Sequence, residues 1–242
     1  MDRRAVSIAA LVLAIGLVVA GFLVGDGFAR GRRNDRFVEV KGLAEREVTA
    51  DLALWPLRYA VSANELADAQ AQITRSTELI RMFLARHGID AASTELQNLQ
   101  VQDANTQRYQ PQRAGPRFII EQTLMVRSEK PDVVQTASQQ VSELVAAGVV
   151  LSSSGEYGVG GPTFIFNGLN ALKPPMIAAA TANARAAAEQ FARDSGTSLG
   201  SIRQANQGVF VILPRDQAPG VQEGGQLHKI VRVVSTVQYF LE

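Results

Sequence analysis

The chain has 242 residues, 46% hydrophobic and 19% charged, which is enough for a substantial core and excludes global disorder. It has 24 basic and 23 acidic side chains; residues 1–36 hold six Arg against three Asp, which leaves 18 basic and 20 acidic side chains in residues 37–242. A body with this balance offers no excess positive charge for phosphate backbones, which counts against nucleic acid as a partner. Cysteine is absent, so disulfides and thiolate metal sites are excluded.

The first feature along the chain is an apolar segment at residues 5–24, AVSIAALVLAIGLVVAGFLV, in which Ser7 is the one polar side chain. Twenty helical residues rise about 30 Å, which matches the hydrocarbon thickness of a bilayer. The segment therefore predicts a transmembrane helix, with the lipid bilayer as a partner. The alternative is a cleaved signal peptide, with cleavage after Ala20 or Ala29, although the run is longer than the usual apolar region of about 7–15 residues.

We therefore divide the chain into a cytoplasmic stub with the anchor (1–29), a basic linker (30–36) and a folded body (37–242). Two arginines precede the apolar segment and four follow it. A strict arginine count places the body in the cytoplasm, whereas a two-arginine start before an apolar run resembles a signal anchor and places it outside. The arginine pattern alone leaves the topology open. Within the segment, Gly21 and Gly25 form a GxxxG spacing that would let two membrane helices pack closely.

The body begins with an alternating segment at residues 37–63, FVEVKGLAEREVTADLALWPLRYAVSA, whose apolar positions change parity. Val48, Ala50, Leu52 and Leu54 fall on even positions and Leu57, Tyr59 and Val61 on odd ones, with Trp55-Pro56 at the change. Proline cannot donate to a strand ladder, and one extra residue in a bulge shifts the parity by one. We therefore expect one long, bent strand with a bulge at this point. The alternative is two separate strands that meet at a corner.

Three segments of the body have the pattern of a helix. A capping box at Ser62 and Glu65 predicts a first helix that runs through about His87 and stops at Gly88.

The second predicted helix has Pro131 in its first turn and stops at Gly148. The third opens at Pro174-Pro175 and runs through AAATANARAAAEQFA to Gly196, with a small alanine face that would let it lie close against a sheet.

Strands are expected between these helices. Residues 94–103, TELQNLQVQD, can pair with residues 117–129, RFIIEQTLMVRSE, across a long loop. Further strands are expected at 164–166, at 208–214 and at 228–242; the last is apolar on both faces, which predicts that helices or another subunit cover both. The pattern predicts an α+β protein, in which the anchor precedes a mixed α/β body with long bent antiparallel strands and three helices.

No residue pattern indicates catalysis, a metal or a cofactor. The sequence has no HExxH, GxSxG or Walker motif, so we expect no catalytic, cofactor-binding or metal-binding residues. His87 is expected in the last turn of the first helix, where a cation is favourable against the helix dipole. His228 is expected to open the last strand. Glu45 and Glu47 share one face of a strand, and a solvated edge explains them.

Residues 152–162, SSSGEYGVGGP, come nearest to a phosphate-binding loop. They lack the GxGxxG spacing and precede a strand rather than a helix, so a flexible turn or bulge is the better interpretation. In an alternative hypothesis, residues 152–168 form part of a small-ligand pocket that includes Tyr157 and Asn167.

Three stretches together resemble the SIMPL-domain family of bacterial envelope proteins, which includes periplasmic immunogenic and oxidative-stress defence proteins. They are FVEVKGLAEREVTADLALW at the start of the body, NARAAAEQFARDSGTSLGSIRQANQG at residues 183–208, and the terminal VRVVSTVQYFLE. The resemblance covers about residues 37–242. It implies a mixed α/β body, export from the cytoplasm and assembly into rings or cages in some members, and it supplies no catalytic residues.

The sequence and the resemblance together predict a membrane-anchored, self-associating bacterial envelope protein without catalytic activity that supports stress tolerance. The resemblance favours a single-pass protein of the inner membrane with its body in the periplasm, against the strict arginine count. The expected partners are copies of the chain itself and the lipid bilayer. The alternative is a periplasmic small-ligand-binding module or an unrecognised hydrolase.

Overall fold

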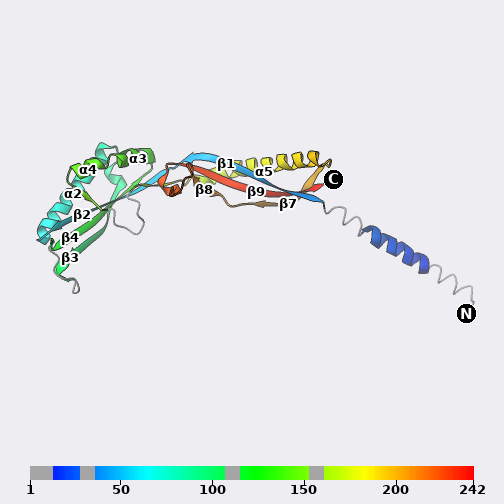
Figure 1. Cartoon of the computed structure of the whole chain (residues 1–242), viewed down its shortest axis with the longest axis horizontal. Helices are drawn as coiled ribbons and strands as arrows, with labels where there is room; N and C mark the ends of the chain where they lie inside the picture. Colours follow the sequence, from blue (N-terminus) through cyan, green and yellow to red (C-terminus); the bar gives the residue numbers. More distant parts are fainter. Residues whose placement is uncertain (1–12, 28–35, 107–114, 153–160) are drawn as a thin grey trace, which may run out of the picture. The chain divides into compact units, whose positions relative to one another are not determined.

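The computed structural model describes residues 13–27, 36–106, 115–152 and 161–242 (Figure 1). A helix at residues 13–27 is followed by β1 (Phe37–Thr49), β2 (Leu52–Ala63), α2 (Leu66–Arg86), β3 (Thr94–Asp103), β4 (Phe118–Ser128), α3 (Pro131–Gln139), α4 (Ser142–Ala146), β5 (Val150–Leu151), β6 (Thr163–Ile165), α5 (Leu169–Asp194), β7 (Leu199–Gln207), β8 (Val211–Pro214) and β9 (His228–Leu241). The fold is α+β, as predicted.

The chain divides into two compact units. The first comprises Met1–Ala44, Pro174–Phe210 and Val233–Glu242, and the second comprises Glu45–Lys173 and Val211–Arg232. One sheet has the strand order β1-β9-β7, with β8 also pairing with β9; the other has the order β3-β4-β2-β5, with β6 also pairing with β2.

The N-terminal helix at residues 13–27 exposes its apolar side chains. More than half of the surface of each large one is exposed: Leu13, Ile15, Leu17, Val18, Val19, Phe22, Leu23 and Val24. In the part of the chain that the structure describes, no helix combines the length and the apolar character needed to cross a membrane. Residues 5–12 of the predicted transmembrane segment lie outside the described residues.

The change of parity at the start of the body does not come from the predicted bulge. β1 ends at Thr49, β2 begins at Leu52, and the two strands belong to different sheets. β2 pairs with β4 along its length without a register shift, so Trp55 and Pro56 lie in a regular ladder. The single bent strand was therefore a wrong prediction. The alternative of two strands is confirmed, with the break at residues 50–51, where the chain passes from one sheet to the other.

The core of the second unit lies between its sheet and the helix α2, and Figure 1 shows α2, α3 and α4 beside β2 and β4. The predicted pairing of β3 with β4 is confirmed. The Tyr59 hydroxyl lies 2.6 Å from Thr77 Oγ1 inside this core, and Thr77 in turn donates to the carbonyl oxygen of Ile73. Burial raises the pKa of Tyr59 above its ordinary value.

The first predicted helix is present as α2, but the predicted capping box is wrong. Ser62 lies in β2, where it pairs with Ile119, and Glu65 occupies the N-cap position without a side-chain hydrogen bond. The helix ends as predicted, because Gly88 adopts a left-handed φ of 78° after the C-cap.

The other two predicted helices differ from the structure in their limits. The second is divided into α3 and α4, with a break at residues 140–141. The third is α5, which begins at Leu169, so that Pro174 and Pro175 lie inside the helix rather than at its start.

In the first unit, α5 packs against β1 through a row of alanines, as its small apolar face predicts. Ala180, Ala184 and Ala188 are fully buried at four-residue intervals. A Cβ atom on Gly42 of β1 would overlap the carbonyl oxygen of Ala180 and lie 2.5 Å from the amide nitrogen of Ala184. Asn183 of α5 also donates a hydrogen bond of 2.8 Å to the carbonyl oxygen of Leu43. The absence of a side chain at Gly42 therefore sets how closely the helix approaches the strand.

Candidate functional site

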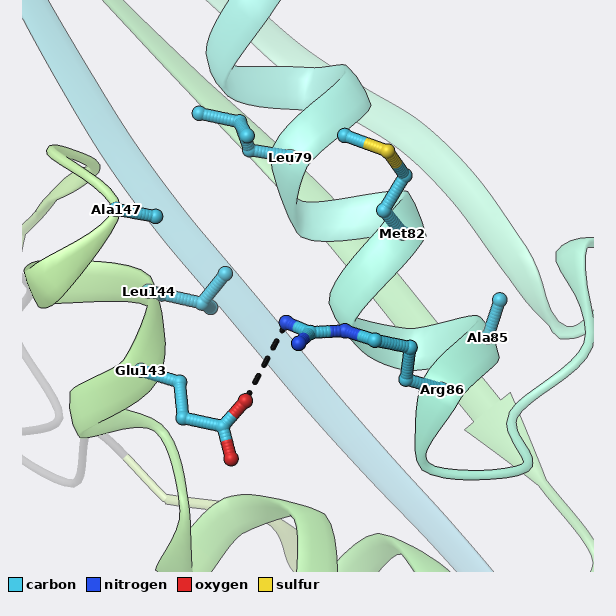
Figure 2. A pocket seen from close by; sticks show the side chains of 7 residues that line it. All are labelled: Leu79, Met82, Ala85, Arg86, Glu143, Leu144 and Ala147. Carbon is cyan, nitrogen blue, oxygen red and sulfur yellow. Dashed lines mark ion pairs between the residues drawn. The ribbon is translucent and has the colours of Figure 1, made fainter.

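A groove between helices α2 and α4 of the second unit is the candidate functional site. It has a volume of about 460 Å³ and is lined by Leu79, Met82, Ala85, Arg86, Glu143, Leu144 and Ala147. Figure 2 shows Leu79 and Met82 of α2 across the groove from Leu144 and Ala147. Met82 is 55% exposed, whereas Leu144 is buried and forms part of the floor. The lining is therefore suited to receive apolar groups.

Charged side chains close one end of the groove. Arg86 Nη2 lies 3.3 Å from a carboxylate oxygen of Glu143, and His87 Nε2 lies 3.6 Å from the other oxygen (Figure 2 marks the arginine pair). The arginine and the glutamate are 67% and 40% exposed, so water screens their attraction and the pair contributes about 0–1 kcal/mol. His87 is the C-cap of α2, and its ring lies 4.5 Å from that of Phe83. Its predicted place at the helix end is confirmed.

A second hollow of about 600 Å³ continues the groove, because both are lined by Leu79 and Ala147. Its other lining residues are Ala60, Val61, Ser62, Gln72, Arg75, Ser76, Pro116, Ile119, Gly148 and Val150. Arg75 is the one charged residue in this lining, and it forms no ion pair within the described part of the chain. We call the groove and this hollow together the α2 depression.

The first unit has a smaller hollow of about 310 Å³. It is lined by Thr181, Arg185, Glu189, Leu199, Gly200, Ser201, Ile202 and Tyr239. No histidine lines this hollow or the α2 depression. The hydroxyl groups in these linings belong to Ser62 and Ser76 in the α2 depression and to Thr181, Ser201 and Tyr239 in the smaller hollow.

The residues named for a possible pocket do not meet in a described cavity. Tyr157 lies outside the described residues. Asn167 is exposed, and its side-chain amide donates a 2.9 Å hydrogen bond to a carboxylate oxygen of Asp51. The same carboxylate accepts hydrogen bonds from the backbone amides of Asn167 and Gly168, just before α5 begins. Asn167 thus takes part in capping a helix, where a negative charge is favourable.

The predicted helix-packing residues Gly21 and Gly25 lie in the N-terminal helix with open space around them. A Cβ atom on either one would have no neighbour within 4 Å. Their role in pairing with a second membrane helix stays a prediction.

The remaining candidate side chains have surface or structural partners. His228 opens β9 as predicted, with its Nδ1 3.4 Å from Thr49 Oγ1. Glu45 pairs with Arg232, and Glu47 lies 3.5 Å from Arg215, so the two glutamates form surface ion pairs.

Lys229 is a buried charge that the sequence pattern did not single out. It is fully buried on β9, forms an ion pair with the Glu223 carboxylate and donates a 2.6 Å hydrogen bond to the Glu223 carbonyl oxygen. A buried ammonium group needs such partners to remain in the protein interior. Lys229 therefore fixes the 3-10 turn at Glu223–Gly225 to the strand.

The candidate site could be found from the sequence only in part. The α2 side of the groove follows from the helical pattern, but Glu143 lies in a segment predicted as one continuous helix. No group of three or more His, Cys, Asp or Glu in the described residues is arranged to hold a metal ion.

Two antiparallel sheets with packed helices define an α+β protein, and its candidate site is a surface groove lined mainly by apolar side chains. The comparison with protein families identifies it further. Residues 38–230 match the SIMPL family, which is described as a protein of unknown function (DUF541), and the chain belongs to this family. No curated protein matches the chain.

Proposed function

We propose that this SIMPL-family protein is a non-catalytic, self-associating protein of the bacterial cell envelope that supports stress tolerance. Its N-terminal apolar helix holds it in the inner membrane as a single-pass protein, and its body lies in the periplasm.

The observation that carries this proposal is the apolar surface of the N-terminal helix. Its eight large apolar side chains, from Leu13 to Val24, are each at least half exposed. Leaving one such side chain in water rather than burying it costs about 1.5–3 kcal/mol, so a helix of this kind requires an apolar environment. The uncharged sequence continues back to residue 5, which gives the length that a bilayer requires.

Self-association is supported by exposed apolar side chains on the body. Met82, Val145 and Val150 are 55%, 60% and 65% exposed, and they belong to neighbouring elements of the second unit. Large apolar side chains grouped on a surface are typical of interaction sites.

A topology reporter tests the localisation. A reporter enzyme that is active only outside the cytoplasm is fused after Glu242, and the same reporter fused to a variant without residues 5–24 is the control. We expect activity only with the apolar segment present and the protein in the membrane fraction. Activity of a cytoplasmic reporter, or a mature chain that is released in soluble form, would refute the proposal.

Light scattering tests self-association of the full chain in a non-ionic detergent. We expect a mass of at least two chains at tens of micromolar, whereas a monomer at that concentration would refute this part of the proposal. The role in stress tolerance predicts that a deletion strain survives peroxide less well than the same strain carrying the gene, and equal survival would contradict it.

A further inference from the structure

One flank of α2 carries six side chains that alternate in spacing between four and three residues. They are Asp68, Gln72, Arg75, Leu79, Met82 and Arg86. This spacing places side chains in one stripe along a helix and is the repeat by which two helices pack against each other. Five of the six are exposed, the exception being the half-buried Leu79. The stripe borders the α2 depression, whose lining includes every member except Asp68.

The charges in this stripe are ordered along the helix. Asp68 lies at its N-terminal end, Arg86 at its C-terminal end and Arg75 between them. Neither Asp68 nor Arg75 has an ion pair within the described residues, and Arg86 pairs with Glu143 through one terminal nitrogen. A guanidinium group has five N–H donors, so Arg86 can bind a second carboxylate.

This order of charges makes the stripe complementary to a second copy in one orientation. If two α2 helices run antiparallel, the Asp68 carboxylate of each copy faces the Arg86 guanidinium of the other. If they run parallel, Asp68 faces Asp68 and Arg86 faces Arg86, which is repulsive at both ends. Near the middle of the stripe, Leu79 of each copy lies level with Arg75 of the other and Met82 lies level with Gln72, so the two apolar side chains pack against the aliphatic stems of these long polar side chains.

We propose that two copies of this chain pair through antiparallel α2 helices, each seated in the α2 depression of the other. This inference rests on the proposed self-association and names the surface that carries it. The second helix would cover Met82, which is 55% exposed, and the groove floor at Leu144 and Ala147. The two-fold axis passes close to residue 77, so that Arg75 lies level with the partner subunit's Leu79.

This geometry fixes which positions of two copies come close. Arg75 of one copy and the partner subunit's Arg75 are displaced along the axis by four residues, or about 6 Å, with the helix axes about 8–10 Å apart. The two Arg86 positions are displaced by 18 residues, or about 27 Å. Thr74 neighbours Arg75 in sequence but lies off the stripe, so it points away from the second helix.

Cross-linking tests this arrangement directly, because the chain has no cysteine and each introduced one is the sole thiol. The exposed positions are changed singly in the full chain, as Arg75→Cys, Arg86→Cys and Thr74→Cys. Each variant, in non-ionic detergent, is treated with a bismaleimide that spans about 8 Å, and its fold is checked by circular dichroism. We expect a cross-linked dimer with Arg75→Cys and little with Arg86→Cys or with the matched control Thr74→Cys.

A charge variant that leaves the apolar contact intact provides a second measurement. Asp68→Lys replaces each of the two symmetric ion pairs by a contact between like charges, and the loss of the pairs alone, at about 0.7 kcal/mol each, raises the dimer dissociation constant about tenfold. The matched variant Asp132→Lys makes the same charge change in the first turn of α3, off the stripe, and we expect it to leave the dissociation constant within about twofold.

The outcomes separate this inference from the proposed function. Dimers in light scattering without cross-linking at Arg75→Cys would overturn the α2 pairing and leave self-association standing. Equal cross-linking at Arg75→Cys and Arg86→Cys would indicate parallel helices and also overturn it. A monomeric chain would overturn both proposals. An equal effect of Asp68→Lys and Asp132→Lys would contradict the assigned charge pairing.

Discussion

The close approach of α5 to β1 allows a sharp test of the packing in the first unit, through the substitution Gly42→Ala. The added methyl group would overlap the Ala180 carbonyl oxygen and lie 2.5 Å from the Ala184 amide nitrogen and 2.9 Å from the Ala184 Cβ atom. Two of these neighbours are backbone atoms inside a helix. They cannot move by changing a rotamer, so the helix and the strand must separate.

The loss in the free energy of unfolding can be estimated from the contacts that are lost when the helix and the strand separate. Overpacking alone costs about 1–3 kcal/mol. A shift of α5 also loosens the buried methyl groups of Ala180, Ala184 and Ala188, at about 0.8 kcal/mol for each methyl group that loses its contacts. The smaller conformational entropy of the unfolded Ala variant returns about 0.4–1 kcal/mol. The expected net loss is about 3 kcal/mol, which lowers the Tm by about 6–12 °C for a body of this size.

Thermal unfolding followed by far-ultraviolet circular dichroism measures this change. Gly225→Ala is the matched control, since a Cβ atom there has no neighbour within 4 Å and the residue does not adopt a positive φ. We expect the control to stay within about 2 °C of the wild type. A Gly42→Ala variant that unfolds at the same temperature as the control would refute the close packing of α5 on β1.

Two further predictions concern carboxylates with defined partners. Asp51→Ala removes the acceptor of the Asn167 and Gly168 backbone amides and should lower the free energy of unfolding by about 1–2 kcal/mol, measured by urea titration. We expect a smaller loss for Asp51→Asn, and equal losses in the two variants would contradict capping by the negative charge. The Arg117 hydrogen bond, together with the Asn105 amide, holds the pKa of Asp103 below its ordinary value of 3.8. The stabilisation of the fold by the ionised Asp103 is therefore complete above about pH 3.8 and is lost as the pH falls through the lowered pKa. Asp103→Asn should therefore make the Tm fall less steeply between pH 4 and 2. A fall of Tm equal to that of the wild type would refute this assignment.

Local sequence patterns predicted those helices and strands in which buried side chains recur at a regular interval within one segment. In β4, which was predicted as part of residues 117–129, Ile120, Leu124 and Val126 share one face of the strand by alternation, and all three are buried. The helix predicted to stop at Gly88 is α2, whose buried residues recur at helical spacing and which ends at that glycine. In both cases the sequence interval of the apolar side chains matches the period of the element, and no distant residue is needed to fix it.

Contacts between residues that are far apart in the sequence determine the ends of the helices and strands that the sequence pattern did not predict. Ser62 has the local pattern of a helix cap, but its pairing with Ile119 keeps it in β2. The start of α5 is capped by Asp51, which lies 116 residues before Asn167 in the chain. The groove depends in the same way on Arg86 and Glu143, which come from two separate helices. A single sequence carries no signal for these contacts.

The strand edges favour a helical surface for self-association. β1, β3 and β7 each lie at the end of a strand order, so each has one edge without a strand partner within the described residues. The edge strand β1 exposes Glu39, Lys41 and Glu45, while β3 and β7 contain register shifts, with Asn98 of β3 at a φ of 50°. Charges and bulges of this kind oppose the addition of further strands, which would otherwise continue without limit. Pairing through α2 avoids this difficulty, because a two-fold contact between identical helices is closed and stops at two copies.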